Sequence, residues 1–233
     1  MTEIKICGIT RLEDALIAAE CGTDALGFIF YPRSPRYISP EKAKELVRRL
    51  PPEVTRVGVF VNEAVETVKE IRTFCGLDLL QLHGDESPDY CRQFPSSLLI
   101  RAVFPRSEEE LSLLEQYSCR AILLDSREGA LYGGTGRPSN WVLGARIRER
   151  FPLILAGGLN PGNILEAMKA VSPHAVDICS GVETVPGIKD PEKIRAIIAG
   201  VRRFQREIGA ESPAVKEHDT FLIFQRMRQL DVI

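Results

Sequence analysis

The sequence predicts a single (β/α)8 barrel of the α/β class, followed by a C-terminal extension. Three observations predict this fold: eight short apolar runs recur at fairly even intervals, amphipathic segments of helical period separate them, and no linker or low-complexity segment divides the chain. Eight such units in about 205 residues match one closed parallel barrel. We therefore expect a barrel domain over residues 1–204 and an extension over residues 205–233.

The predicted strands are short runs rich in apolar residues. They are Ile4–Cys7, Ala25–Phe30, Val54–Val61, Leu77–Leu82, Leu98–Val103, Ala121–Leu124, Leu153–Ala156 and Ala175–Cys179. An open, doubly wound sheet is the competing architecture. It would usually show fewer strands and a G-x-G-x-x-G turn after the first strand, and this chain has no such turn.

The predicted helices lie between the strands and carry apolar residues at helical spacing. Ser39 is suited to cap one of them, and Asn160 followed by Pro161 is suited to begin another. The helices are expected over Arg11–Glu20, Pro40–Leu50, Glu63–Phe74, Ser87–Phe94, Glu108–Tyr117, Ser139–Arg150, Asn160–Ala170 and Pro191–Arg203.

The extension has two interpretations. Residues 205–219 are polar, with Gly209 and Pro213 as helix breakers, whereas residues 220–230 regain apolar side chains and have the composition of a short helix. We favour a partly ordered tail over a helix that docks on the barrel or on a second subunit.

The composition indicates a cytoplasmic protein without nucleic-acid or membrane partners. The chain is 44% hydrophobic and 27% charged, and its net charge of −2 favours neither nucleic acid nor an anionic membrane surface. The six cysteines are scattered without a C-x-x-C pair, a pattern typical of reduced thiols. No apolar run approaches the roughly 18 residues of a membrane span, and no signal peptide is visible.

Several polar residues interrupt strands that should be apolar on both sides. An unpaired buried polar group costs about 1–3 kcal/mol, so these exceptions are informative. If their faces point inward, Cys7, His83, Asp125 and Asp177 surround the C-terminal mouth of the barrel, where barrel enzymes place their chemistry. Any one of them could instead be a satisfied polar core residue, but four at strand ends are hard to explain as packing.

Proton transfer is the chemistry that these residue types favour. The sequence has no G-x-S-x-G elbow, no H-E-x-x-H motif and no acidic cluster of the kind that binds a metal, so we expect no metal site. Cys7 can act as a base when ionised, and Asp125 can act as an acid if burial raises its pKa. Because an ordinary thiol is mostly protonated at neutral pH, Lys5 on the same strand face is a candidate source of positive charge.

Two glycine-containing turns predict a phosphate site. Gly157 and Gly158 follow the seventh strand, and Ser180 and Gly181 follow the eighth. Backbone N–H groups that converge from these turns can hold a phosphate dianion, and (β/α)8 barrels bind phosphate at this place. The alternative is two ordinary turns in which glycine serves only the reversal of the chain.

Two further loops adjoin the predicted mouth. Arg36 follows the second strand and can grip a planar carboxylate through two parallel hydrogen bonds, or it is a solvated loop cation. The glycine-rich segment 132–136 follows the sixth strand and either closes over a ligand or is a plain connector.

Taken together, these segments resemble the phosphoribosylanthranilate isomerase family. The resemblance runs from residue 4 to about residue 190 in the family's order. It is carried by KICGIT at 5–10, GFIF at 27–30, SPR at 34–36, VGVFVN at 57–62, LQLHG at 80–84, LDS at 124–126, GGTG at 133–136, LAGGL at 155–159 and SGVE at 180–183.

The resemblance implies an Amadori rearrangement of N-(5-phosphoribosyl)anthranilate, a phosphosugar, in tryptophan biosynthesis without a cofactor or metal. It implies that Asp125 protonates the ribose ring oxygen and that Cys7 then removes the proton from the sugar C2. By the same likeness Arg36 holds the anthranilate carboxylate, Gly157, Gly158, Ser180 and Gly181 bind phosphate, and His83 and Asp177 line the site. The extension departs from the family's usual length and leaves open whether the protein is a monomer or a homodimer.

Two other functions compete with this interpretation. The histidine-pathway Amadori isomerase is similar in chemistry, but it works with an aspartate at the end of strand 1, where this chain has Cys7. A phosphosugar-binding barrel without catalysis is the other, and the presence of both Cys7 and Asp125 argues against it.

Overall fold

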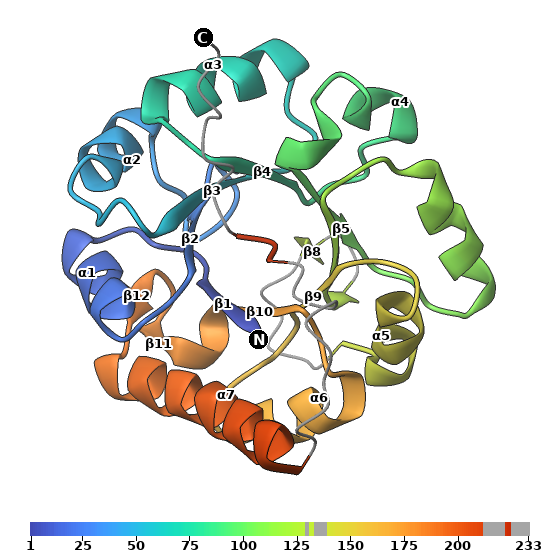
Figure 1. Cartoon of the computed structure of the whole chain (residues 1–233). Helices are drawn as coiled ribbons and strands as arrows, with labels where there is room; N and C mark the ends of the chain where they lie inside the picture. Colours follow the sequence, from blue (N-terminus) through green and yellow to red (C-terminus); the bar gives the residue numbers. More distant parts are fainter. Residues whose placement is uncertain (129–130, 133–138, 212–221, 225–233) are drawn as a thin grey trace, which may run out of the picture.

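Eight parallel strands close into one barrel, as the sequence predicts. The computed structural model describes residues 1–128, 131–132, 139–211 and 222–224. The barrel strands are β1 (Glu3–Ile6), β2 (Ala25–Ile29), β3 (Thr55–Phe60), β4 (Leu79–Leu82), β5 (Leu99–Val103), β6 (Ala121–Leu124), β9 (Leu153–Leu155) and β10 (Ala175–Ile178). Their order around the ring is β1-β10-β9-β6-β5-β4-β3-β2 (Figure 1).

The helices lie outside this ring of strands (Figure 1). They are α1 (Leu12–Glu20), α2 (Pro40–Val47), α3 (Val65–Cys75), α4 (Pro88–Cys91), α5 (Trp141–Arg148), α6 (Ile164–Val171) and α7 (Pro191–Glu211), with 3-10 turns η1 (Ser96–Leu98), η2 (Glu109–Gln116) and η3 (Ser180–Val182). Two small antiparallel pairs join β7 (Arg127–Glu128) to β8 (Leu131–Tyr132) and β11 (Glu183–Val185) to β12 (Ile188–Lys189). No helix among the described residues is long and apolar enough to span a membrane.

The predicted helix boundaries differ from the observed ones where turns replace helical residues. Ser39 caps α2 as expected, because its hydroxyl accepts a hydrogen bond from the N–H of Lys42 at 3.3 Å. Asn160 does not begin α6. Its side chain accepts from the N–H of Gly162 at 2.8 Å and holds a turn, so the helix starts only at Ile164. The segment predicted as a helix over 108–117 forms the 3-10 helix η2.

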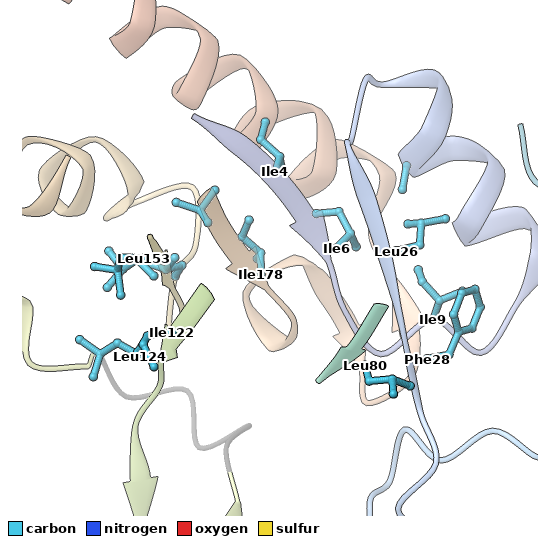
Figure 2. Close-up of a cluster of buried hydrophobic side chains, with 14 of the residues drawn as sticks. Ile4, Ile6, Ile9, Leu26, Phe28, Leu80, Ile122, Leu124, Leu153 and Ile178 are labelled. Carbon is cyan, nitrogen blue, oxygen red and sulfur yellow. The ribbon is translucent and has the colours of Figure 1, made fainter. Parts of the chain in front are cut away.

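Alternate residues of each strand face the helices. Ile4 and Ile6 of β1 and Leu26 and Phe28 of β2 are fully buried in the layer between the strands and the helices, as Figure 2 shows. This layer is the main hydrophobic core, and it includes Ala15, Ala18, Leu46, Val47, Val68, Leu143, Ile147, Ala167, Met168, Ile194 and Ile197 from the helices. Burial of these side chains against helices on every side keeps the strand ends in fixed positions.

The intervening residues of the strands fill the inside of the barrel. They form a second apolar cluster, whose members are Ala25, Val57, Leu79, Ile100, Ala102, Ala121, Leu123, Ile154 and Ala175 of the strands and Ala156, which follows β9. In the parallel register Glu3 pairs with Ala175 and Lys5 pairs with Ala25, so both charged side chains share this inner face. The interior of the barrel is therefore apolar except at a few positions, which include Glu3 and Lys5.

Residues 222–224 of the extension close the N-terminal end of the barrel. Ile223 is fully buried and Phe224 is 3% exposed, and both belong to the inner cluster. The Glu3 carboxylate accepts hydrogen bonds from the N–H groups of both residues, and the Thr55 hydroxyl donates to the Phe224 carbonyl. Figure 1 shows this short red segment within the ring of strands.

The expected boundary between barrel and extension, at 204/205, falls inside α7, which continues to Glu211. Most of the helix expected over 220–230 lies outside the described residues, of which 222–224 make the contacts above. Residues 222–224 thus take part in the packing of the barrel interior.

We predict that Phe224→Ala lowers the free energy of unfolding by about 3 kcal/mol, because a buried phenyl ring is replaced by a cavity. Urea denaturation measures the change. Val142→Ala, at a position 73% exposed on α5, is the matched control and should shift stability by less than about 0.5 kcal/mol. Equal effects of the two substitutions would show that residues 222–224 do not stabilise the barrel.

We also predict that Glu3 makes stability depend on pH. Burial raises the pKa of Glu3 from 4.5 to about 7. The folded protein therefore holds this proton more tightly than the unfolded chain, so its contribution to stability is full below about pH 4.5 and is lost as pH rises through 7. Replacing Glu3 by glutamine should make the variant more stable, relative to wild type, at pH 8 than at pH 5 in urea denaturation. The exposed Glu20→Gln should show no such trend, and parallel profiles for Glu3→Gln and wild type would disprove the prediction.

Candidate active site

The carboxyl ends of β1 and β10 meet at the mouth of the barrel. Lys5 pairs with Asp177 and Ile6 with Ile178 in the parallel register, and the N–H of Cys7 donates to the Ile178 carbonyl at 2.8 Å. Inside the barrel, the Lys5 ammonium donates to Asp177 Oδ2 at 2.8 Å, and both side chains are buried. Because strand side chains alternate, Cys7 lies on the same inner face as Lys5, two residues nearer the mouth.

Gly27 provides the room for the Cys7 thiol. A Cβ atom at Gly27 would lie 2.6 Å from the Cys7 sulfur, which no side chain tolerates without displacing it. Cys7 is 4% exposed, and the side chain of Cys179, the residue after β10, acts on its pKa. The side chain of Cys7 therefore points into the barrel and away from the helical layer.

The electrostatic environment shifts the pKa values of Cys7 and Cys179 in opposite directions. The interaction with the Cys179 side chain and burial raise the pKa of Cys7 well above its ordinary value, although the positive charge of Lys5 lowers it. For Cys179 the interaction with the Cys7 side chain lowers the pKa to about 7, and the charges of Lys189 and Arg36 act in the same direction against burial. Lys5 thus favours a Cys7 thiolate, as expected, but it is outweighed in this arrangement.

Asp125 follows β6 and faces His83, which follows β4. His83 Nε2 lies 3.2 Å from Asp125 Oδ2, and the other carboxylate oxygen accepts from the N–H of Ser126 at 2.6 Å. The Gln81 amide lies 2.7 Å from His83 Nδ1, on the same inner face of β4. In this amide orientation Gln81 donates to Nδ1, so a neutral His83 carries its proton on Nε2, the nitrogen that lies next to Asp125.

Arg36 belongs to a buried cluster of charges. Its Nε and Nη2 donate to the Glu183 carboxylate at 2.9 and 2.7 Å, and Lys189 Nζ donates to the same carboxylate at 2.8 Å. Burial lowers the pKa of Arg36, but the hydrogen bonds to Glu183 raise it above its ordinary value, so the guanidinium stays charged. Sequence reasoning did not single out Glu183 and Lys189 for the site.

The two predicted phosphate turns converge. Gly157 and Gly158 have φ values of +83° and +60°, which favour glycine. A Cβ atom at Gly181 would lie 1.9 Å from the Leu159 carbonyl oxygen, so the absence of a side chain lets the two turns touch. Ser180 and Gly181 open η3, and the first N–H groups of such a turn lack acceptors within it.

A pocket of about 460 Å³ opens beside Asp125, next to the ends of β5 and β6. Phe104, Ser126, Ser139 and Asn140 are among the residues that line it. Arg101, a polar residue of β5, also lines this pocket, and its guanidinium donates to Glu86 at 2.7 Å and lies 5.1 Å from the centre of the Tyr117 ring. Its strand neighbours Leu82 and Ile122 face the helices, so Arg101 fixes loops outside the barrel interior.

The structure brings the predicted site residues to one end of the barrel in adjoining groups. Cys7, Asp177 and Arg36 lie around the β1–β10 seam, His83 and Asp125 form a pair, and the glycine turns follow β9 and β10. Residues 133–136 of the glycine-rich segment lie outside the described residues. In the part of the chain that the structure describes, no group of three or more His, Cys, Asp or Glu side chains is placed to hold a metal ion.

A closed barrel that carries a buried thiol, a carboxyl–imidazole pair and paired charges at its C-terminal mouth is an enzyme of the (β/α)8 class. The family model for N-(5'-phosphoribosyl)anthranilate (PRA) isomerase matches residues 4–200. The chain therefore belongs to the PRA isomerase family.

Named relatives and solved structures agree with this assignment. The N-(5'-phosphoribosyl)anthranilate isomerase of Syntrophus aciditrophicus is 71% identical over 228 residues, which cover 97% of this chain and 98% of the relative. That match includes most of the extension. The enzyme of Citrifermentans bemidjiense is 48% identical over 203 residues, 87% of this chain and 98% of the relative. The crystal structure from Thermotoga maritima has a TM-score of 0.79 at 44% identity and covers 87% of this chain and 100% of its own. A phosphoribosyl anthranilate isomerase structure in complex with reduced 1-(o-carboxyphenylamino)-1-deoxyribulose 5-phosphate is similar at a TM-score of 0.76 and 42% identity, with 87% of this chain and 100% of that chain covered.

We predict that Glu183→Gln lowers the free energy of unfolding by about 3–5 kcal/mol, because it leaves two buried cations without their shared carboxylate. Urea denaturation at pH 7 measures the loss. Glu192→Gln is the matched control, since it removes an exposed partner of Arg195 and should cost less than about 1 kcal/mol. Similar losses in the two variants would mean that the buried cluster does not hold the mouth together.

Proposed function

We infer that this chain catalyses the isomerase reaction of its family, the Amadori rearrangement of N-(5'-phosphoribosyl)anthranilate to 1-(2-carboxyphenylamino)-1-deoxyribulose 5-phosphate in tryptophan biosynthesis. The observation that carries the assignment of residues is the position of Cys7 and Asp125. Both follow barrel strands at the C-terminal end, Cys7 lies on the inner face, and Asp125 lines the pocket beside the ends of β5 and β6. The isomerisation moves hydrogen within one molecule and requires acid–base chemistry rather than electron transfer.

Asp125 is the proposed acid. Its carboxyl group lines the 460 Å³ pocket, which gives it access to a bound sugar. Protonation of the ribose ring oxygen breaks the bond to C1 and leaves a protonated Schiff base. The contact of His83 Nε2 with Asp125 Oδ2 at 3.2 Å orients the carboxyl group and provides a route by which its proton is replaced.

Cys7 is the proposed base. It removes the proton from the sugar C2, and the resulting enolamine tautomerises to the ketone. A buried thiol with a raised pKa is a weak base on its own, so the positive charge of Lys5, which favours the thiolate, supports the assignment. Lys5 itself stays charged because Asp177 raises its pKa against the effect of burial.

The two anionic ends of the substrate, the anthranilate carboxylate and the phosphate, have separate proposed contacts in the site. Glu183 occupies Nε and Nη2 of Arg36, and the remaining Nη1 edge of the guanidinium is the proposed contact for the anthranilate carboxylate. The converging turns at Gly157, Gly158, Ser180 and Gly181 are the proposed phosphate site. His83 and Asp177 line the space between these ends.

We further propose that the enzyme works in the cytoplasm, as a monomer or a homodimer. The reduced state of the cysteines supports the compartment. One similar structure, 41% identical with a TM-score of 0.78, is described as mutually generated monomers of the dimeric isomerase from Thermotoga maritima. Both states thus occur among close structural relatives.

We predict that Cys7→Ser and Asp125→Asn each lower kcat by at least about 100-fold, because each removes a group that transfers a proton. Loss of the fluorescence of phosphoribosylanthranilate measures turnover. Cys21→Ser, directly after α1, and the exposed Asp89→Asn are matched controls away from the mouth and should retain activity. Turnover that survives in Cys7→Ser or in Asp125→Asn would refute the role of that residue, and a wild type that binds without turnover would be a phosphosugar-binding protein.

A further inference from the structure

His83 and Asp125 meet across an intervening strand. The strand order β6-β5-β4 puts β5 between the strand that ends before Asp125 and the strand that ends before His83, and yet His83 Nε2 lies 3.2 Å from Asp125 Oδ2. On the β6 side, the N–H of Asp125 donates to the Val103 carbonyl of β5 at 3.2 Å. The contact between the two side chains therefore depends on how firmly the chain around His83 is fixed to β5.

Arg101 of β5 fixes the main chain on both sides of His83. The backbone pairing between β4 and β5 ends with the pair Leu82 and Arg101. At this point Arg101 Nη1 donates to the Leu82 carbonyl at 3.0 Å, and Nη2 donates to the Gly84 carbonyl at 3.1 Å. One planar guanidinium thus holds the carbonyls of the residues before and after His83, and its rigid fork fixes where they lie.

Glu86 completes this arrangement, and we call Arg101 and Glu86 together the clamp. The Glu86 carboxylate accepts from Arg101 Nη1 at 2.7 Å and from the Gly84 N–H at 2.9 Å. It also accepts from the N–H of Asn62, after β3, at 2.9 Å, so the clamp ties the loop after β4 to the strand ends on either side. The side chains of Arg101 and Glu86 are only 7% and 1% exposed, and a buried, charge-assisted pair tolerates little displacement.

The imidazole ring of His83 has supports of its own. The Gln81 amide lies 2.7 Å from Nδ1, and the Phe104 ring, directly after β5, packs edge-on with 5.4 Å between the ring centres. The His83 N–H donates to the Phe60 carbonyl at 2.8 Å. These contacts orient the ring, whereas the clamp sets where the backbone carries it relative to Asp125.

We propose that Arg101 and Glu86 are positioning residues for the isomerase reaction. They hold His83 against Asp125, the proposed acid, and they act on the substrate only through this pair. The inference rests on the proposed role of Asp125. Because the proposed contacts for the carboxylate and the phosphate, at Arg36 and the glycine turns, lie at other strand ends, loss of the clamp should slow the reaction without weakening binding.

The test is a double-mutant cycle between Arg101→Lys and His83→Asn, measured as kcat with phosphoribosylanthranilate. Lysine keeps the positive charge beside Glu86 but lacks the planar fork that reaches both carbonyls. We expect Arg101→Lys to lower kcat about tenfold or more and to change KM by less than about twofold. In the His83→Asn background, itself slower than wild type, Arg101→Lys should lower kcat by less than about twofold, because the group that it positions is gone.

Arg56→Lys is the matched control. Arg56 is 6% exposed, as Arg101 is, and it too donates to main-chain carbonyls, those of Leu50 at 3.4 Å and Pro51 at 3.1 Å, but it lies near the N-terminal end of β3. It should leave kcat within about twofold of its starting value in both backgrounds. Circular dichroism and urea denaturation establish that the variants are folded. If Arg101→Lys is unstable, Glu86→Asp, which keeps the charge but shortens the side chain, carries the same cycle.

Nuclear magnetic resonance of protein labelled with 15N-histidine is a second readout, which needs no turnover. The chain has three histidines, so the signals lost in His83→Asn identify those of His83. Arg101→Lys should shift the ring nitrogen signals of His83, whereas Arg56→Lys should leave them in place.

Losses in kcat that multiply in the double variant, a KM that rises as kcat falls, or unmoved His83 signals would overturn the proposal, since the clamp would then not act through His83. A His83→Asn variant as fast as wild type would overturn it as well. The two proposals fail separately. If the wild type shows no turnover, or if Asp125→Asn keeps it, the proposed function or its acid is wrong, and the His83 signals alone decide whether the clamp holds this residue. If Asp125→Asn is inactive and the losses multiply, only the role of the clamp is wrong.

Discussion

The buried ion pair between Lys5 and Asp177 is the constraint on which the mouth of this barrel depends. It lies where the first and the last strand of the ring meet, and its register sets which residues follow at the carboxyl ends. A buried pair tolerates little displacement, because either charge alone would be costly in the interior. Cys7 and Cys179 directly follow these two strands, so the contact that closes the ring also fixes where both residues lie.

Much of the fold could be predicted from the sequence because the barrel repeats one local rule eight times. Apolar residues on both faces mark each strand, and the predicted strand over 121–124 agrees with β6 at both ends. The alternation of side chains along a strand also predicts that Lys5 and Cys7 share one face. The ion pair of Lys5 with Asp177 inside the barrel confirms that the Lys5 side chain points inward. Membership of the isomerase family, expected from scattered short motifs, is confirmed by the family model over residues 4–200.

The site residues that the sequence did not predict depend on contacts between distant parts of the chain. Glu183 and Lys189 were missed because their partner Arg36 is about 150 residues away, and no local pattern encodes such a pair. Cys179 could have been found, since it follows Asp177 with the same spacing that separates Cys7 from Lys5. The binding roles of Arg36 and of the glycine turns stay predictions, because they concern contacts with the substrate.

The hydrogen bonds from Ile223 and Phe224 to Glu3 have a consequence for how the protein is made. The bonded residues are 220 and 221 positions apart in the sequence, so the Glu3 carboxylate cannot form these hydrogen bonds until residues 223 and 224 have been synthesised. The first strand emerges earliest and is the last to be completed, since β10 and then the chain end must reach it. A chain that stops before residue 222 would therefore leave a cavity where Ile223 and Phe224 lie, at the end of the barrel opposite the chemistry.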